Sequence, residues 1–101
     1  MNARTRKYYD WLAARPCLRC GGSPVEIAHV RAFRSPKTDL LLGRREGIAA
    51  LAAVPLCAAC HRTAFDSIHA SGEAAFEAGI GKGDGYLVQK AASFIAEFYL
   101  S

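Results

Sequence analysis

Apolar side chains recur at helical spacing near both ends of the chain. Tyr8, Trp11 and Leu12 fall on one helical face among charged neighbours, which predicts an amphipathic helix over residues 3–14. Residues 86–100 form a second such pattern, whose apolar face carries Leu87, Ala91, Phe94, Ile95 and Phe98. We expect this second helix to close the hydrophobic core or to pack against a second copy of the chain.

Shorter patterns fill the middle of the chain. Alternating side chains over residues 24–30 predict a short, half-buried strand. Glycine, proline and basic residues make 31–47 a long connection, with a turn of helix expected at 39–42. Two further helices are predicted, one over 58–68 and one over 73–78. The expected fold class is α+β.

The length of the chain limits how many folding units it can hold. With 101 residues, about half of them apolar, it is long enough for one domain and too short for two independent cores. We therefore predict a single domain over residues 1–101, with a core at about 15–80 between the two flanking helices. A chain this short buries only about two-thirds of the surface that it exposes when unfolded, so a bound metal would add needed stability.

Charge is divided unevenly along the sequence. Residues 1–62 carry a net charge of +7, and residues 63–101 carry −3. The basic part suits a polyanionic partner, and the acidic part suits packing, self-association or a protein partner. No apolar run approaches the roughly 20 residues of a membrane span, and the N-terminus does not resemble a signal peptide. We expect a cytoplasmic protein without membrane contact.

Four cysteines form two pairs, Cys17-x2-Cys20 and Cys57-x2-Cys60, separated by 36 residues. In each pair, two intervening residues let both sulfurs reach one tetrahedral ion. In a reducing compartment, such pairs are better explained as metal ligands than as disulfides. Four thiolates fill the coordination shell, so the sequence predicts one structural zinc ion. Gly21 and Gly22 follow the first pair and favour a tight turn there.

All three histidines lie close to these elements. His29 ends the predicted strand, His61 directly follows the fourth cysteine, and His69 lies further along the same helical region. Joining the cysteine pairs at one ion brings the strand beside the helix, so His29 and His61 can face a common cleft. One imidazole could then take a proton from water while another holds a divalent cation against a phosphate. A straight helix would separate His61 from His69 by about 12 Å, so sharing one ion requires a bend near Asp66.

A series of short motifs together resembles a known family. They are Cys17-x2-Cys20, Ala28-His29, Val54-Pro55-Leu56-Cys57-x2-Cys60-His61-Arg62-Thr63, Asp66, His69, Gly72-Glu73 and Phe76. Over about residues 15–80 the chain resembles the HNH endonuclease superfamily, with its zinc-stabilised treble-clef, ββα-metal core. Within that superfamily it is most similar to phage and prophage proteins akin to the RecA-dependent recombination nuclease Ref.

The resemblance implies a role for each matching residue. His29 would be the general base, His61 would bind a catalytic Mg²⁺, Mn²⁺ or similar ion, and Asp66 and His69 would be further metal or phosphate contacts. Two positions depart from the family pattern. Ala28 stands where an Asp or His commonly adds a metal ligand, and Ala52 stands where the middle Asn is expected. With that Asn absent, we expect a backbone carbonyl of the long connection to accept the second ring proton of His29.

Basic residues surround the proposed cleft. They are Arg31, Arg34, Lys37, Arg44, Arg45 and Arg62. Contacts of this kind give salt-sensitive binding to phosphates without sequence preference. These residues do not distinguish DNA from RNA, but the family resemblance favours DNA. The leading hypothesis is a DNA endonuclease for phage recombination or DNA processing, with DNA and a recombinase filament or another phage or host protein as partners. The alternatives are a catalytically degenerate zinc module that binds DNA or a phage protein, and a thiol switch.

Overall fold

The computed structural model describes residues 3–31, 48–83 and 85–100. In chain order the elements are α1 (Ala3–Ala13), β1 (Glu26–His29), α3 (Ile48–Leu51), β2 (Ala53–Leu56), η2 (Ala59–Thr63), α4 (Ile68–Ser71), α5 (Glu73–Gly79) and α6 (Tyr86–Leu100). This is a small α+β fold, as predicted. The predicted turn of helix at 39–42 lies outside the described residues.

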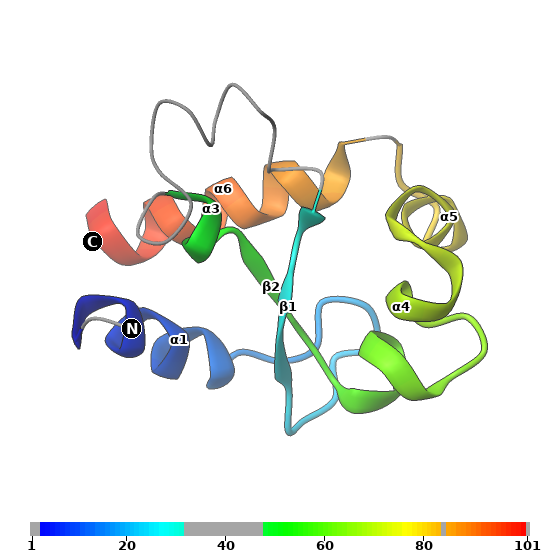
Figure 1. Cartoon of the computed structure of the whole chain (residues 1–101), viewed down its shortest axis with the longest axis horizontal. Coiled ribbons are helices and arrows are strands. Elements are labelled where there is room, and N and C mark those ends of the chain that lie inside the picture. Colours follow the sequence, from blue (N-terminus) through cyan, green and yellow to red (C-terminus); the bar gives the residue numbers. More distant parts are fainter. Residues whose placement is uncertain (1–2, 32–47, 84, 101) are drawn as a thin grey trace.

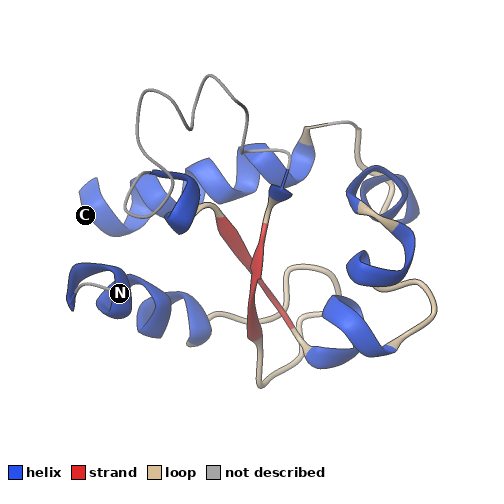
Figure 2. Ribbon diagram, in the orientation of Figure 1, coloured by secondary structure: helices blue, strands red, loops and turns tan. Residues whose placement is uncertain are grey.

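A two-stranded antiparallel sheet lies at the centre of the molecule (Figures 1 and 2). Ile27 pairs with Pro55, and His29 pairs with Ala53. In Figure 1 the helix α1 lies on one side of the sheet, α4 and α5 lie on the other side, and α6 runs across the top of the sheet towards α5. The sheet therefore lies between α1 and α4, the helix that carries His69.

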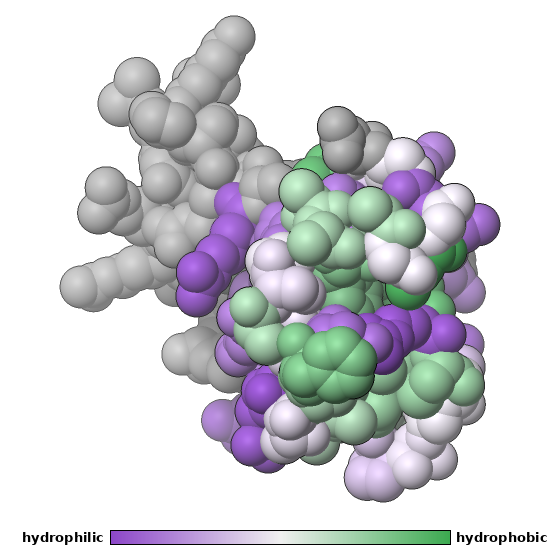
Figure 3. Space-filling model, turned by 90° about the vertical axis from the view of Figure 1, so that its right-hand side faces the viewer, coloured by the Kyte–Doolittle hydropathy of each residue, from purple (hydrophilic) through white to green (hydrophobic). Residues whose placement is uncertain are grey.

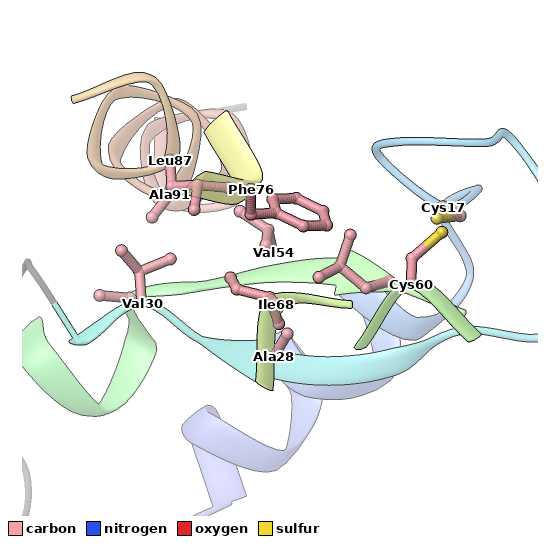
Figure 4. Packing of buried hydrophobic residues seen from close by; sticks show 11 residues of the cluster. Cys17, Ala28, Val30, Val54, Cys60, Ile68, Phe76, Leu87 and Ala91 are labelled. Atoms are coloured by element: carbon pink, nitrogen blue, oxygen red, sulfur yellow. The ribbon is translucent and has the colours of Figure 1, made fainter. Parts of the chain in front are cut away.

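Side chains alternate between the two faces of β1, so adjacent residues of this strand pack against different clusters. Ala28 belongs to a buried cluster that also contains Phe76, whereas Ile27 packs on a second cluster built around Tyr8 and Leu12 of α1. Figure 4 shows the first cluster, in which Leu87 and Ala91 of α6 lie above the strands. The predicted flanking helices therefore both cover the sheet, and α6 closes the core as expected.

The continuous helix predicted over residues 58–68 is wrong. Residues Ala59–Thr63 form one wide π-helical turn, and the chain becomes extended at Ala64, with φ −77° and ψ 154°. A new helix then starts at Ile68, because the Ser67 hydroxyl accepts a hydrogen bond from the amide of Ala70 at 3.2 Å. This N-cap satisfies an amide that would otherwise have no helical partner. The break occurs where the sequence required a bend if the two histidines beyond it were to meet.

Candidate functional site

Four cysteine sulfurs meet at one point. All four lie within 4.8 Å of one another, and the sulfurs of Cys20 and Cys57 are 3.6 Å apart. In a tetrahedral site with zinc–sulfur bonds of about 2.3 Å, sulfurs are separated by about 3.8 Å. Cys17 and Cys60 are buried, with their sulfurs side by side at the edge of the core (Figure 4). The cluster is compatible with a structural metal ion such as zinc, as predicted.

Backbone hydrogen bonds shape the turn that holds the first cysteine pair. The amide of Cys17 donates to the carbonyl of Gly22 and the amide of Gly21 donates to the carbonyl of Cys17, each at 2.9 Å. Gly21 has φ +76°, a conformation that residues with a β-carbon rarely adopt. The amide of Leu18 donates to Pro55 in β2 at 2.8 Å, which fixes this turn beside the second cysteine pair.

The surroundings of the cysteines favour ionisation at one position and oppose it at another. Burial raises the pKa of the Cys17 thiol, but the backbone amides of Cys20, Cys57 and Arg19 outweigh it and lower that pKa to about 6. Burial raises the pKa of Cys60, and the neighbouring thiols raise it further. A cation would supply the charge that four close thiolates need.

Glu26 links two residues of η2. Its Oε1 lies 2.8 Å from Nδ1 of His61, and its carboxylate accepts two forked hydrogen bonds from Arg62, at 3.0 Å to Nε and 2.9 Å to Nη2. Arg62 and then His61 lower the pKa of Glu26 to about 2, so the carboxylate is ionised and can only accept. Nδ1 of His61 must therefore carry the proton, which leaves Nε2 as the ring nitrogen with a free lone pair.

The break at Ala64 brings His61 and His69 together. Their ring centroids are 4.3 Å apart, with the rings tilted by 66°. A straight helix would have held them about 12 Å apart. The wide turn of η2 followed by an extended segment therefore produces the approach that the sequence required for a shared ion.

A cleft of about 280 Å³ lies beside these rings. It is lined by His29, Arg31, Ile68, His69, Gly72 and Glu73. His69 thus borders both the cleft that contains His29 and the ring of His61. We call these three residues the histidine row, because His69 contacts the ring of His61 and lines the same cleft as His29. On the side of the molecule that carries α4 and α5, hydrophobic and hydrophilic residues lie next to each other (Figure 3).

His29 is held from the side of α1. Its Nε2 lies 2.9 Å from the hydroxyl of Tyr9 and 3.2 Å from the carbonyl oxygen of Ala50. The hydroxyl of Tyr9 also donates to that same carbonyl. A backbone carbonyl does approach the ring, but it belongs to Ala50 in α3 and not to the 31–47 connection, where it was expected. Tyr9 is an additional contact that the sequence did not indicate.

Asp66 pairs with Arg19 and is not among the residues that line the cleft. Its carboxylate accepts a hydrogen bond from Nη2 of Arg19 at 2.8 Å, and its backbone carbonyl accepts one from Nη1 at 2.9 Å. This pair ties the turn between η2 and α4 to the first cysteine turn. The carboxylate of Asp66 therefore helps to hold the turn before α4 beside the first cysteine turn, through its hydrogen bond with Arg19.

The predicted DNA-contacting residues fall into three groups. Arg31 is exposed and lines the cleft, and its amide donates to the carboxylate of Glu73 at 2.5 Å. Arg62 is held by Glu26, which offsets its charge. The four remaining residues lie outside the described part of the chain: Arg34, Lys37, Arg44 and Arg45.

Two groups at the site were missed by the sequence analysis. Glu26 carried a weak signal, because it is an acid in the predicted strand three residues before His29. Tyr9 carried none, because it lies 20 residues before His29 and was not among the residues of the predicted apolar face of its helix. Both act through contacts that only the folded chain creates.

Among residues 3–31, 48–83 and 85–100, the four cysteines are the one group of three or more potential ligands close enough to hold a metal ion. No helix in this part of the chain is long and apolar enough to cross a membrane. No model of a known protein family, no curated protein and no solved structure matches the chain. What the site can do therefore has to follow from its own residues.

Proposed function

We propose that the chain is a metal-dependent, HNH-type endonuclease that hydrolyses DNA phosphodiester bonds with little sequence preference. In this proposal the sheet, the cysteine cluster and η2 form a treble-clef, ββα-metal core. The observation that carries the proposal is the row of histidines: His61 and His69 lie ring against ring, and His69 shares a cleft with His29. Arg31, at the wall of that cleft, supplies the positive charge that a phosphate requires.

His61 and His69 are the proposed ligands of a catalytic cation. Glu26 holds the proton of His61 on Nδ1, so Nε2 is left to bind metal. Two imidazoles suit Mn²⁺, Zn²⁺ or a related transition ion better than Mg²⁺, which prefers oxygen ligands. Such an ion, when bound, stabilises the negative charge that develops on the phosphate and on the leaving oxygen. Substrate oxygens and water would complete its coordination.

His29 is the proposed general base. Its neutral imidazole takes a proton from water as the water oxygen forms a bond to phosphorus, and the bond to the leaving oxygen breaks. The leaving oxygen then receives a proton from solvent. The ring needs one unprotonated nitrogen directed at the cleft for this step, and the cleft wall is where His29 lies.

Plasmid nicking by the zinc-loaded protein tests this function. We expect relaxation of supercoiled DNA in the presence of Mn²⁺, and a loss of about 100-fold in the maximal rate for His29→Ala. His61→Ala should instead raise the Mn²⁺ concentration that is needed, because it removes a ligand and not the base. Nicking that continues undiminished in His29→Ala would exclude this residue as the base, and His69 would be the next residue to test.

A second function, a non-catalytic zinc module that binds DNA or a phage protein, is favoured by one observation. Within the described residues the histidines do not form a group of three potential ligands around one point. Ala28, buried in the core, cannot supply the missing ligand. Paramagnetic broadening distinguishes the two functions: Mn²⁺ should broaden the NMR signals of His61 and His69 in a nuclease, and should leave both sharp in a binding module.

A further inference from the structure

We infer that Tyr9 is a positioning residue that fixes the tautomer of His29 and so leaves Nδ1 as the nitrogen that accepts the proton. The role in catalysis rests on the proposed nuclease function, whereas the tautomer itself does not. Three groups from different elements meet here: Tyr9 on α1, His29 at the end of β1 and the carbonyl of Ala50 in α3. The two rings also meet edge to face, with centroids 5.8 Å apart.

The placement of the protons follows from what each atom can do. The Ala50 carbonyl oxygen has no proton and can only accept. The hydroxyl oxygen of Tyr9 is in hydrogen-bond contact with this carbonyl oxygen. Two oxygens in such contact repel each other unless a proton lies between them. The hydroxyl proton of Tyr9 must therefore point at Ala50.

The hydroxyl oxygen then has only lone pairs left for its other neighbour, Nε2 of His29, at 2.9 Å. A contact of this length is favourable only if Nε2 carries the proton. The same N–H lies 3.2 Å from the carbonyl of Ala50, so a single proton faces two acceptors. In the neutral imidazole, Nδ1 is consequently the nitrogen with the free lone pair.

The contact with Tyr9 takes the place of a side chain that would orient the ring of His29 and that this sequence lacks. The residue expected to orient the base is an Asn, but the corresponding position is Ala52, whose side chain has no polar atom. Ala52 still contributes its carbonyl, which accepts from the amide of Val30 at 2.9 Å and so holds the end of β1. Orientation of the ring falls to Tyr9. Burial raises the pKa of Tyr9, which keeps its hydroxyl protonated at neutral pH.

Nitrogen NMR of the zinc-loaded protein with ¹⁵N-labelled imidazoles tests the inference. Tyr9→Phe removes one hydroxyl and keeps the ring. Tyr8→Phe is the matched control, because Tyr8 is the adjacent tyrosine of α1 and its buried hydroxyl has no hydrogen-bond partner among the described residues. Neutral His29 should be protonated at Nε2 in the wild type and in Tyr8→Phe. In Tyr9→Phe a larger share should carry the proton on Nδ1, because one of the two acceptors is gone.

The same variants are then compared in the nicking assay. Tyr9→Phe should lower the maximal rate by roughly 10-fold or more, as expected when a group that orients a functional side chain is lost, with DNA affinity unchanged and Tyr8→Phe equal to the wild type. Neutral His29 protonated at Nδ1 in the wild type, or the same tautomer ratio in Tyr9→Phe, would overturn the inference. A wild type that shows the Nε2 proton and does not nick DNA would instead refute the nuclease and leave the tautomer assignment standing.

Discussion

Replacement of Cys57 by serine removes one of the four sulfurs of the cysteine cluster and should unfold the chain. The sulfurs of Cys57 and Cys20 are 3.6 Å apart, so this change breaks a direct link between the first cysteine turn and the end of β2. What remains to hold that turn is a small set of hydrogen bonds, such as the one from Leu18 to Pro55, and the ion pair of Arg19 with Asp66.

The expected size of the effect follows from comparing two free energies. Structural zinc contributes about 10 kcal/mol or more to folding when the site forms only in the folded chain. The total free energy of unfolding of a domain this size is about 5–15 kcal/mol. Since the metal contributes about as much as the whole fold retains, a chain that binds zinc poorly should be largely unfolded at 25 °C.

His61→Ala is the matched control, since His61 follows Cys60 directly but lies outside the sulfur cluster. It removes the hydrogen bond to Glu26, which costs about 1.5–3 kcal/mol for a bond to a charged group, while Arg62 still holds that carboxylate. The protein should remain folded.

Thermal unfolding followed by circular dichroism, together with the zinc content of each purified variant, measures these outcomes. A Cys57→Ser protein with the wild-type midpoint and without zinc would show that the metal does not hold the fold. A His61→Ala protein as unfolded as Cys57→Ser would place His61 in the structural site and deprive the proposed nuclease of its ligand.

Three further results are expected. Phe76→Ala should lower the free energy of unfolding, measured with denaturant, by about 3–5 kcal/mol, because Phe76 is 2% exposed. Phe65 is 92% exposed, so Phe65→Ala should change this free energy by less than about 0.5 kcal/mol. Equal effects of the two changes would contradict the packing described. Contacts in the folded chain lower the pKa of Glu26 to about 2, so its contribution to the free energy of unfolding should be complete above pH 4.5 and lost as the pH falls towards about 2. A titration midpoint of this carboxyl near 4.5 by NMR would refute the lowered pKa. Arg31→Glu should weaken binding to all DNA sequences alike and reduce the dependence of affinity on salt, and an unchanged salt slope would move the DNA path elsewhere.

Local patterns predicted those parts of the fold that local forces determine. The C-terminal helix begins at Tyr86 and ends at Leu100, as its apolar periodicity indicated, and the N-terminal helix ends one residue before the predicted limit. The prediction of one continuous helix after the second cysteine pair was wrong, because the alanines in this segment fit a helical pattern and periodicity does not detect a break. There the competing N-cap at Ser67 and the pairing of Asp66 with Arg19 determine the path.

Spacing was similarly informative for the metal cluster and uninformative for the histidine row. Two CxxC pairs constrain the geometry by themselves, so the meeting of the four sulfurs was predictable. The partners of the histidines were not, because Glu26 is 35 residues from His61 and Tyr9 is 20 residues from His29. Contacts of this range depend on how the elements pack, which no local pattern records.

The position of Tyr9 on α1 changes what counts as the smallest working fragment of this protein. A chain shortened to begin at Pro16 would retain all four cysteines and all three histidines, and would still match every short motif by eye. It would lack the hydroxyl that holds the ring of His29, and the sheet would lose the cover of Tyr8 and Leu12. A truncation guided by the motifs alone would therefore keep the cysteines and histidines and lose the hydroxyl that contacts His29.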